Sequence, residues 1–345
     1  MEAGHAGWNL TGNRFGFGLP AIAETRQIHF SGVASAGADL IYTLWTDTVG
    51  GLFEYQTGDG FERRLYHRNQ FRAGDVQRHP GSGRLAMSLA ADAGTVRLGI
   101  TEPDGRKLRT VTEGDAIDQA PSWVEGQPET LVYQSAGIGR NASGFYAGQS
   151  SFAIYRLDLT TGNNDELLVD ERHDLLLPRQ RADGTLYYIR RPFQGVPRAS
   201  PWRLLRDILL FPIGVVLAIV HFLNFFSLMF RQKPLITSGG PPSHGQDPKF
   251  LMLYGRVIQA DKLLRKRVDT SPLVPADWQL IRRSPGGAET VLAKGVGSYD
   301  FVQDGEGIVY TDGSGIWLLE PSAPALRIGT GRLIERVITV AAATP

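Results

Sequence analysis

Short stretches in which apolar and polar residues alternate recur along most of this chain. A clear example is 129–135, Glu-Thr-Leu-Val-Tyr-Gln-Ser, which is followed by apolar stretches at 152–162 and 166–169. Many stretches end in an Asp-Gly or Thr-Gly pair. Alternation with period two predicts strands, and such pairs supply the positive φ angles that tight hairpins need. We therefore expect a chain built mainly from antiparallel strands.

The stretches repeat as a unit of about 40 to 45 residues, which is the length of a four-stranded propeller blade. Four copies of the unit can be aligned, at 39–66, 84–111, 120–169 and 305–328. The clearest copy, 120–169, holds an apolar inner strand, a second strand, a strand that ends in a turn and an outer strand, and three stretches of each other copy align with it. A repeat of this length predicts a repeated four-stranded sheet.

The phrases Ile154-Tyr-Arg-Leu-Asp-Leu-Thr-Thr-Gly162 and Asp183-Gly-Thr-Leu-Tyr-Tyr188 resemble blades of the TolB-like propeller family. These blades read roughly Pro-x-Trp-Ser-x-Asp-Gly, then an apolar strand, then Ile-Tyr-x-x-Asp-x-x-Thr-Gly. The resemblance covers 25–191 and 277–340, and it departs from the family where this chain has Trp123-Val-Glu-Gly126. It implies an all-β, five- to six-bladed β-propeller. It implies no function, because propellers host many functions.

The resemblance also divides the chain. Residues 25–191 hold blades one to four, of which the fourth is incomplete, and 277–340 hold the rest of blade four, blade five and a closing strand. Residues 1–24 are an N-terminal segment that is expected to complete the ring. Between these parts, 192–276 form an α-helical insertion in the fourth blade, between its second and third strands. A helix is predicted to start there, with Ser200 as N-cap and Pro201 at the first helical position.

An apolar run of 23 residues, 208–230, follows in the insertion and is interrupted only by His221, Asn224 and Ser227. It is long enough to cross a membrane. Because both ends of the insertion join the same blade, both must lie on one side of the membrane, so we expect a monotopic helix in one leaflet. A spanning helix with two separate domains, and burial against a protein partner, are the alternatives. An ionisable His221 in such a run is a functional candidate.

Two sets of residues in the insertion are expected to touch the membrane or a partner. The membrane-contact residues are Trp202, Leu205, Leu209, Phe211, Val215, Ile219, Phe222, Phe225, Phe226 and Phe230. The residues expected at lipid headgroups or a partner are Arg203, Arg206, Arg231, Lys233, Arg265, Lys266 and Arg267.

The insertion and the rest of the chain also differ in net charge. The span 192–276 holds eleven Lys and Arg against four Asp, which gives +7, and the remaining 25 basic and 31 acidic residues give −6. A basic segment on an acidic body favours an anionic partner, either lipid headgroups or an acidic protein surface. A solvated basic loop is the alternative.

Two further segments have candidate contact surfaces. Residues 249–267 are predicted to form an amphipathic helix that packs on the propeller or on lipid. The long loop 136–151 of the third blade, with Arg140, Phe145 and Tyr146 among glycines, should emerge beside the insertion. We expect this loop either to contact a partner or to be a surface loop.

The sequence offers no catalytic signature. It has no cysteine, which excludes disulfides and thiol chemistry, and it lacks hydrolase, metalloprotease, phosphate-loop and calcium-loop motifs. The seven histidines show no ligand spacing, although two could meet in a central channel. No catalytic residue, cofactor, metal or nucleic-acid partner is therefore predicted.

The predicted function is that of a non-enzymatic, membrane-associated propeller, a scaffold or accessory subunit with protein contacts in a membrane complex such as a respiratory or photosynthetic assembly. One alternative is a lactonase- or glycosidase-like hydrolase with a site in the channel. The other is a soluble propeller whose insertion packs on itself. The first residues resemble no signal peptide, so we expect the cytoplasmic face of a bacterial-type inner membrane.

Overall fold

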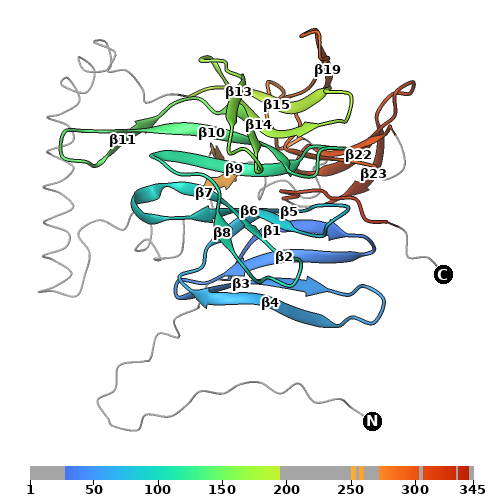
Figure 1. Cartoon of the computed structure of the whole chain (residues 1–345). Coiled ribbons are helices and arrows are strands. Elements are labelled where there is room, and N and C mark those ends of the chain that lie inside the picture. The colour runs from blue at the N-terminus through green and yellow to red at the C-terminus, as the bar shows by residue number, and fades with distance from the viewer. Residues whose placement is uncertain are drawn as a thin grey trace, which may run out of the picture.

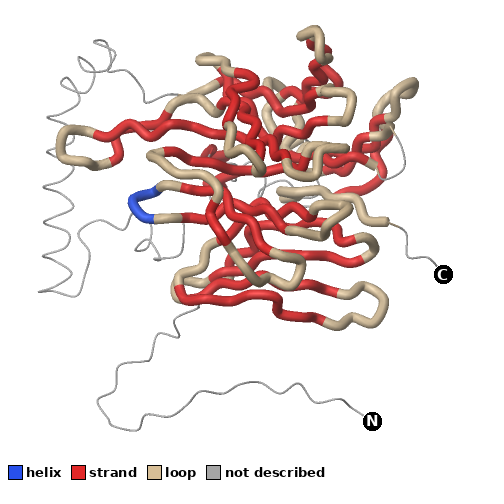
Figure 2. Tube along the Cα trace, viewed as in Figure 1, coloured by secondary structure: helices blue, strands red, loops and turns tan. Residues whose placement is uncertain are grey.

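A computed structural model describes residues 28–194, 250–253, 256–259, 272–302, 306–331 and 333–341. Within these ranges the regular secondary structure is almost entirely β-strand, and its one helical element is a short 3₁₀ turn, η1 (Asp92–Gly94) (Figures 1 and 2). The all-β prediction is confirmed for this part of the chain. The strands form five successive four-stranded units and one separate hairpin.

The first unit is an antiparallel sheet in simple meander order. Its strands are β1 (His29–Ala36), β2 (Asp39–Trp45), β3 (Val49–Tyr55) and β4 (Glu62–Asn69). The turn between β1 and β2 contains Gly37 at φ 77°, an angle that glycine adopts without strain. The face of this sheet that carries Ala34, Ile41 and Leu52 is buried against the second unit.

The second and third units are joined into one larger sheet. The second consists of β5 (Ala73–Arg78), β6 (Leu85–Ala90), β7 (Val96–Thr101) and β8 (Arg109–Thr110). The third consists of β9 (Ala116–Trp123), β10 (Thr130–Arg140), β12 (Ala153–Asp158) and β13 (Asn164–Leu168). They are linked by one parallel pairing, of Val96 with Ile117. Strand β11 (Tyr146–Gln149) pairs with the far end of β10.

The fourth unit is assembled from distant parts of the sequence. Strands β14 (His173–Gln180) and β15 (Leu186–Pro192) are followed by β18 (Gln279–Arg283) and β19 (Glu289–Lys294). Strand β15 pairs directly with β18, with Leu186 opposite Arg283. More than eighty residues of sequence therefore leave and re-enter this sheet between its second and third strands.

The fifth unit is again a meander, of β20 (Ser298–Phe301), β21 (Ile308–Thr311), β22 (Gly315–Leu319) and β23 (Leu326–Thr330). Residues 333–341 follow it as an extended segment without strand pairing. We call 333–341 the C-terminal segment.

Three inner strands share one unusual backbone feature. Asp75 in β5, Ala120 in β9 and Leu177 in β14 all have φ near +50°, and the strand register shifts beside each of them. Such a bulge bends a strand and re-aims the side chains that follow it. Because the same bulge recurs in three units, the internal repeat extends to backbone conformation.

The inner strands β1, β5, β9, β14 and β20 surround a common axis, since residues of all five line the same two cavities. Each neighbouring pair of units shares a hydrophobic core, from the first and second to the fourth and fifth. Figure 1 shows the sheets following one another around this axis, from blue to red. The arrangement is propeller-like, as the repeat predicts.

One part of the predicted insertion is wrong. Strands β16 (Phe250–Leu253) and β17 (Arg256–Gln259) pair as an antiparallel hairpin inside the segment that was predicted to be an amphipathic helix. Leu251 pairs with Ile258 across the hairpin, so the apolar residues that fit a helical period also fit a cross-strand pair. β-Branched Val257 and Ile258 favour the strand.

Within the described ranges no helix is long and apolar enough to cross a membrane. The apolar run 208–230 lies outside these ranges. So do all the predicted membrane-contact and headgroup residues, from Trp202 to Lys233 and from Arg265 to Arg267, and the N-terminal segment 1–24.

Candidate ligand pocket at the propeller axis

A cavity of about 800 Å³ lies at one end of the axis. We call it the axial pocket. It is formed where the inner strands end and the next turns begin, so each unit contributes a few residues. The lining side chains that the argument below uses are Arg78, His79, Trp123, Glu125, Gln127, Arg179, Gln180, Arg181, Asp300 and Phe301.

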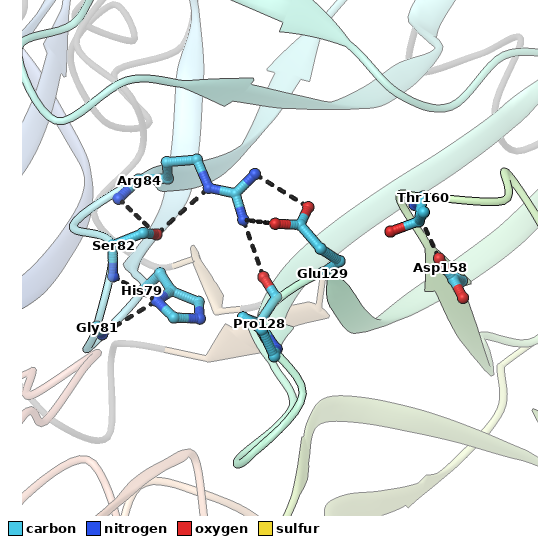
Figure 3. A network of polar contacts seen from close by, with 8 residues as sticks. All are labelled: His79, Gly81, Ser82, Arg84, Pro128, Glu129, Asp158 and Thr160. Carbon is cyan, nitrogen blue, oxygen red and sulfur yellow. Dashed lines mark hydrogen bonds and ion pairs between the residues drawn. The ribbon is translucent and has the colours of Figure 1, made fainter.

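One wall is fixed by an arginine that joins two units (Figure 3). Arg84 donates two hydrogen bonds to the carboxylate of Glu129, at 2.6 and 3.1 Å, and a third to the carbonyl of Pro128 at 2.9 Å. The guanidinium also lies 5.2 Å from the centre of the Trp123 ring. This bidentate pair holds the turn after β5 against the turn after β9, which makes the wall rigid.

His79 is buried in the same wall, and its protonation is set by the backbone. Its Nδ1 accepts hydrogen bonds from the N–H groups of Gly81, at 3.0 Å, and Ser82, at 2.8 Å (Figure 3). Burial, and then the positive charge of Arg84, lower the pKa of His79. The ring is therefore neutral at pH 7 and carries its proton on Nε2, so it acts as a hydrogen-bond donor and not as a base.

The opposite wall contains two ion pairs, one between the fourth and fifth units and one between the fourth and third. Arg179 lies 2.6 Å from Asp300, and both side chains are largely buried. Arg181 lies over the Phe301 ring, at 3.9 Å, and 3.5 Å from Glu125. The two acidic side chains that line the pocket are thus both paired with arginine.

Two buried polar atoms in the pocket lining have no hydrogen-bond partner among the described residues. They are the donor Nε1 of Trp123 and the acceptor Oε1 of Gln180. An unsatisfied buried polar atom costs about 1–3 kcal/mol, so a partner is expected for each. Arg78 also lines the pocket, and no ion pair with it occurs in the described part of the chain.

The axis is closed below the pocket by the C-terminal segment. Arg336 forms an ion pair with Asp75, and Thr339 donates its N–H to Asp300 at 2.7 Å. The second cavity on the axis, lined by Val33, Asp75 and Arg336, has a volume of only about 30 Å³. That is room for about one water molecule. Among the described residues, the C-terminal segment thus separates the axial pocket from the small cavity below it.

No group of three or more His, Asp and Glu side chains that could hold a metal ion occurs in the described part of the chain. The predicted contact loop forms a projecting hairpin of β10 and β11, at the left of Figure 1. There Phe145 and Tyr146 are exposed by 71% and 55%. Arg140 is held by Asp115, at 2.8 and 3.0 Å. This hairpin and the axial pocket do not share lining residues.

Sequence reasoning did not find the pocket residues. They come from six segments that are far apart in the sequence, and only Trp123, Glu125 and their neighbours in 123–126 stand in a stretch that the blade pattern singled out. The repeat offers a partial signal, because equivalent positions at the ends of the inner strands lie at the same end of the axis, although the bulges at Asp75, Ala120 and Leu177 are visible only in the structure.

No protein-family model matches the sequence, and neither does any curated protein sequence. Among solved structures, the chain is similar to TolB from Acinetobacter baumannii, with 11% identity and a TM-score of 0.49, over 90% of this chain and 56% of that one. It is also similar to a TolB of Agrobacterium tumefaciens, with 11% identity and a TM-score of 0.48, over 89% of this chain and 84% of that one. A third similar structure is a puromycin-hydrolysing peptidase of Mycobacterium tuberculosis, with 11% identity and a TM-score of 0.46, over 90% of this chain and 49% of that one.

The chain thus spans just over half of the Acinetobacter protein. The similar structures include both TolB proteins and enzymes, so they do not distinguish a binding protein from an enzyme. The structural neighbours of this chain are TolB-like propeller proteins, and its propeller-like fold follows independently from its own strand pairing.

Proposed function

We propose that this chain is a non-enzymatic, membrane-associated propeller that holds a segment of a partner polypeptide in its axial pocket. One observation carries the proposal. Both acidic side chains of the pocket are paired with arginine, whereas a buried donor on Trp123 and a buried acceptor on Gln180 have no partner among the described residues. Trp123 and Gln180 would hydrogen-bond to a neutral polar group in the pocket once their side chains turn towards it.

A peptide amide is a neutral group of that kind. Its carbonyl oxygen accepts from an indole N–H, and its N–H donates to an amide oxygen. The pocket is also open to solvent at one end and walled by aromatic rings, which suits an extended segment with an apolar side chain. Arg78, Arg179 and Arg181 outnumber Glu125 and Asp300 by one, so an acidic residue in the partner segment is favoured.

Hydrolysis in the pocket fits these residues less well. A glycosidase of the common type needs two carboxyl groups with separate roles, one of them ready to give up a proton. Here each carboxylate is held as the partner of an arginine, 2.6 Å away for Asp300 and 3.5 Å away for Glu125. His79 offers a donor and not a base.

The membrane part of the proposal rests on the sequence. The apolar run 208–230 and the excess of seven positive charges in 192–276 support attachment to an anionic membrane surface. The propeller, with five or six blades, would be attached through the insertion in its fourth blade. It would act as a scaffold or accessory subunit of a membrane complex and present its axial pocket to a partner. For the membrane and its side we keep the expectation from the sequence, which is the cytoplasmic face of a bacterial-type inner membrane.

Peptide selection tests the proposal. The full chain is used as bait for a displayed library of random peptides, and the recovered peptides are measured against the wild type, Trp123→Phe, Arg181→Ala and the surface control Val291→Ser. Val291 is 44% exposed on β19 and does not line the pocket. We expect affinity to fall about tenfold, or about 1.4 kcal/mol, in both pocket variants and to be unchanged in the control. Equal binding by all four proteins, or no recovered peptide, contradicts the proposal.

A further inference from the structure

A further cavity, of about 550 Å³, lies between the first and second sheets. Its lining comes from β4, from the link between β4 and β5, and from β6, β7 and β8. We call it the arginine pocket, because Arg68, Arg72, Arg97 and Arg109 line it. It shares no lining residue with the axial pocket, so a ligand bound here is independent of one bound at the axis.

The arginine pocket is strongly basic. Among the described residues no aspartate or glutamate lines it, so the four guanidinium groups give the lining a charge of +4. None of the four makes an ion pair in the described part of the chain. In the axial pocket, by contrast, Arg179 and Arg181 are both paired with carboxylates. Because like charges that lie close together repel one another, the arginine pocket is expected to bind an anion.

Two of these arginines face each other from neighbouring sheets. In β4, Arg68 stands opposite Gly50, on the face whose Leu52 is buried in the core with the second unit. In β7, Arg97 stands opposite Leu89, which packs against the same core. Directly opposite residues of an antiparallel pair share a face, so both arginine side chains leave their sheets towards the space between the two units.

Arg97 has a buried donor without an acceptor. Its Nε atom is buried and has no hydrogen-bond partner among the described residues. A guanidinium N–H that is removed from water without an acceptor destabilises the fold, so an acceptor is expected there. Because the N–H groups of a guanidinium form a planar fork, the acceptor that fits it best is a group with two oxygens.

Arg72 is held beside the pocket by an aromatic ring. Its guanidinium lies 5.0 Å from the centre of the Trp45 ring, and Trp45 stacks in turn on His29 at 4.0 Å. Its carbonyl accepts a hydrogen bond from the N–H of Ala90 at 2.9 Å, which ties the link before β5 to the end of β6. Stacking on a ring orients a guanidinium and leaves the N–H groups at its edge available for an anion.

The other part of the lining is apolar. Three partly buried side chains, Leu89, Leu108 and Tyr66, pack against the core that the first two units share. Phe71, which also lines the pocket, belongs to that core. At Gly99 a Cβ would lie 2.3 Å from Cδ1 of Leu89 and 3.4 Å from Cδ1 of Leu108, so this glycine makes room for both leucines. The combination favours an anion that carries an apolar group.

We propose that the arginine pocket binds a phosphate monoester that carries an apolar group. At pH 7 a phosphate monoester has a charge of about −1.5 to −2, so it offsets more of the +4 lining than a single carboxylate does. Its oxygens fit the planar forks of Arg97 and Arg68. The apolar group then lies against Leu89 and Leu108. This chemistry is found both in soluble phosphate esters and in the headgroup of phosphatidic acid.

Titration calorimetry with phenyl phosphate tests the proposal on the full chain in phosphate-free buffer. Arg97→Gln and Arg68→Gln are compared with the wild type and with the control Arg64→Gln. Arg64 is exposed on the same strand as Arg68, but it stands opposite Phe53 and does not line the pocket. We expect the affinity to fall about tenfold in Arg97→Gln and about threefold in Arg68→Gln, and to be unchanged in the control. Phenyl phosphate should also bind more tightly than inorganic phosphate, which has no apolar group.

Thermal unfolding gives a second readout. Phenyl phosphate should raise the unfolding midpoint of the wild type and of Arg64→Gln, and it should raise that of Arg97→Gln much less, because a ligand stabilises only the protein that binds it. If Arg97→Gln does not fold, Arg68→Gln replaces it, since Arg68 is exposed and its loss leaves the core intact.

Vesicles distinguish the two sources of the phosphate group. The four proteins are sedimented with phosphatidylcholine vesicles that contain or lack phosphatidic acid. A soluble ligand predicts that the two pocket variants lose affinity for phenyl phosphate and sediment like the wild type. A lipid ligand predicts that they lose binding to phosphatidic acid. The proposal is overturned if neither variant loses affinity in either experiment, or if Arg64→Gln loses as much as Arg97→Gln.

Discussion

The three middle units and the two outer units of this chain are built from the same repeat but are packed differently. The second, third and fourth sheets are covered by a neighbouring sheet on both faces, and three of the four largest fully buried side chains, Trp278, Tyr133 and Tyr188, lie in the third and fourth units, whereas the other, Tyr299, lies in the fifth. Among the described residues, the first and fifth sheets are each covered by a neighbouring sheet on one face only. The stability of the fold is therefore expected to be concentrated in the middle, while the outer sheets keep surfaces available for other contacts.

The largest effect is expected at Trp278. Its side chain is fully buried in the core that joins the third, fourth and fifth units, and Arg191 lies 4.8 Å from its ring. Trp278→Ala should lower the free energy of unfolding by about 3–5 kcal/mol. Urea unfolding followed by circular dichroism measures this. A loss below about 1 kcal/mol would show that the middle core does not dominate stability.

The next effect concerns a buried ion pair. Asp174 and Arg191 lie 2.8 Å apart with side-chain exposures of 5% and 6%. Asp174→Ala leaves the guanidinium buried without this carboxylate and should cost about 3 kcal/mol. Asp174→Asn, which keeps the hydrogen bond from the N–H of Phe152, should cost less. If both variants were as stable as the wild type, the ion pair would make no contribution.

Arg84 tests the wall of the axial pocket. Arg84→Met keeps the contact with the Trp123 ring but loses the pair with Glu129. Because Glu129 is about half exposed, we expect a loss of only about 1 kcal/mol of stability. The pocket should be affected more, so binding of a selected peptide should weaken while the unfolding midpoint changes little. The reverse pattern would assign Arg84 to stability and not to the pocket.

Asp118 gives a pH-dependent comparison. Burial in β9 raises its pKa above the ordinary 3.8, although Ser135 and Thr112 donate hydrogen bonds to it. A carboxyl group with a raised pKa favours the folded state when protonated, and this contribution is lost as the pH rises through the folded pKa. Asp118→Asn should therefore match the wild type at acid pH and exceed it by about 1 kcal/mol at pH 7. Urea unfolding between pH 3 and 7 measures the difference; a constant difference over this range contradicts it.

The smallest effect is expected in the fifth sheet. Leu326 on the edge strand β23 is 62% exposed, so Leu326→Ser should change the free energy of unfolding by less than about 0.5 kcal/mol. Thermal unfolding of Leu326→Ser, measured side by side with that of Trp278→Ala, compares the outer sheet with the middle core directly. A loss comparable to that of Trp278→Ala would mean that the outer sheet is as well packed as the middle.

Much of the strand order could be predicted from the sequence. The stretch at 39–45 is strand β2, and the stretches at 278–283 and 289–293 are β18 and β19 within one residue. These predictions succeed because alternation and hairpin turns are local properties. The pairing of β15 with β18 places a long segment inside the fourth sheet, and this too could be deduced, from the incomplete repeat.

Other features depend on contacts between distant segments. The hairpin of β16 and β17 was predicted to be helical, since Leu251 and Ile258 satisfy both periods and only their pairing decides between them. The axial pocket needs Trp123, Gln180 and Phe301 at one end of the axis, and no sequence spacing connects them. The C-terminal segment was expected to be a closing strand, but it joins the first and fifth sheets through side chains and single backbone contacts.

The most direct test of the central claim is photo-cross-linking in the native cells. A benzophenone amino acid is placed at Gln127, which is exposed in the lining of the axial pocket, and at Val291 as the matched surface position. The proposal predicts a discrete adduct with a polypeptide at position 127, lost in the Trp123→Phe and Arg181→Ala backgrounds, and no such adduct at position 291. Equal adducts at both positions, or none at position 127, would contradict the binding of a polypeptide in the axial pocket.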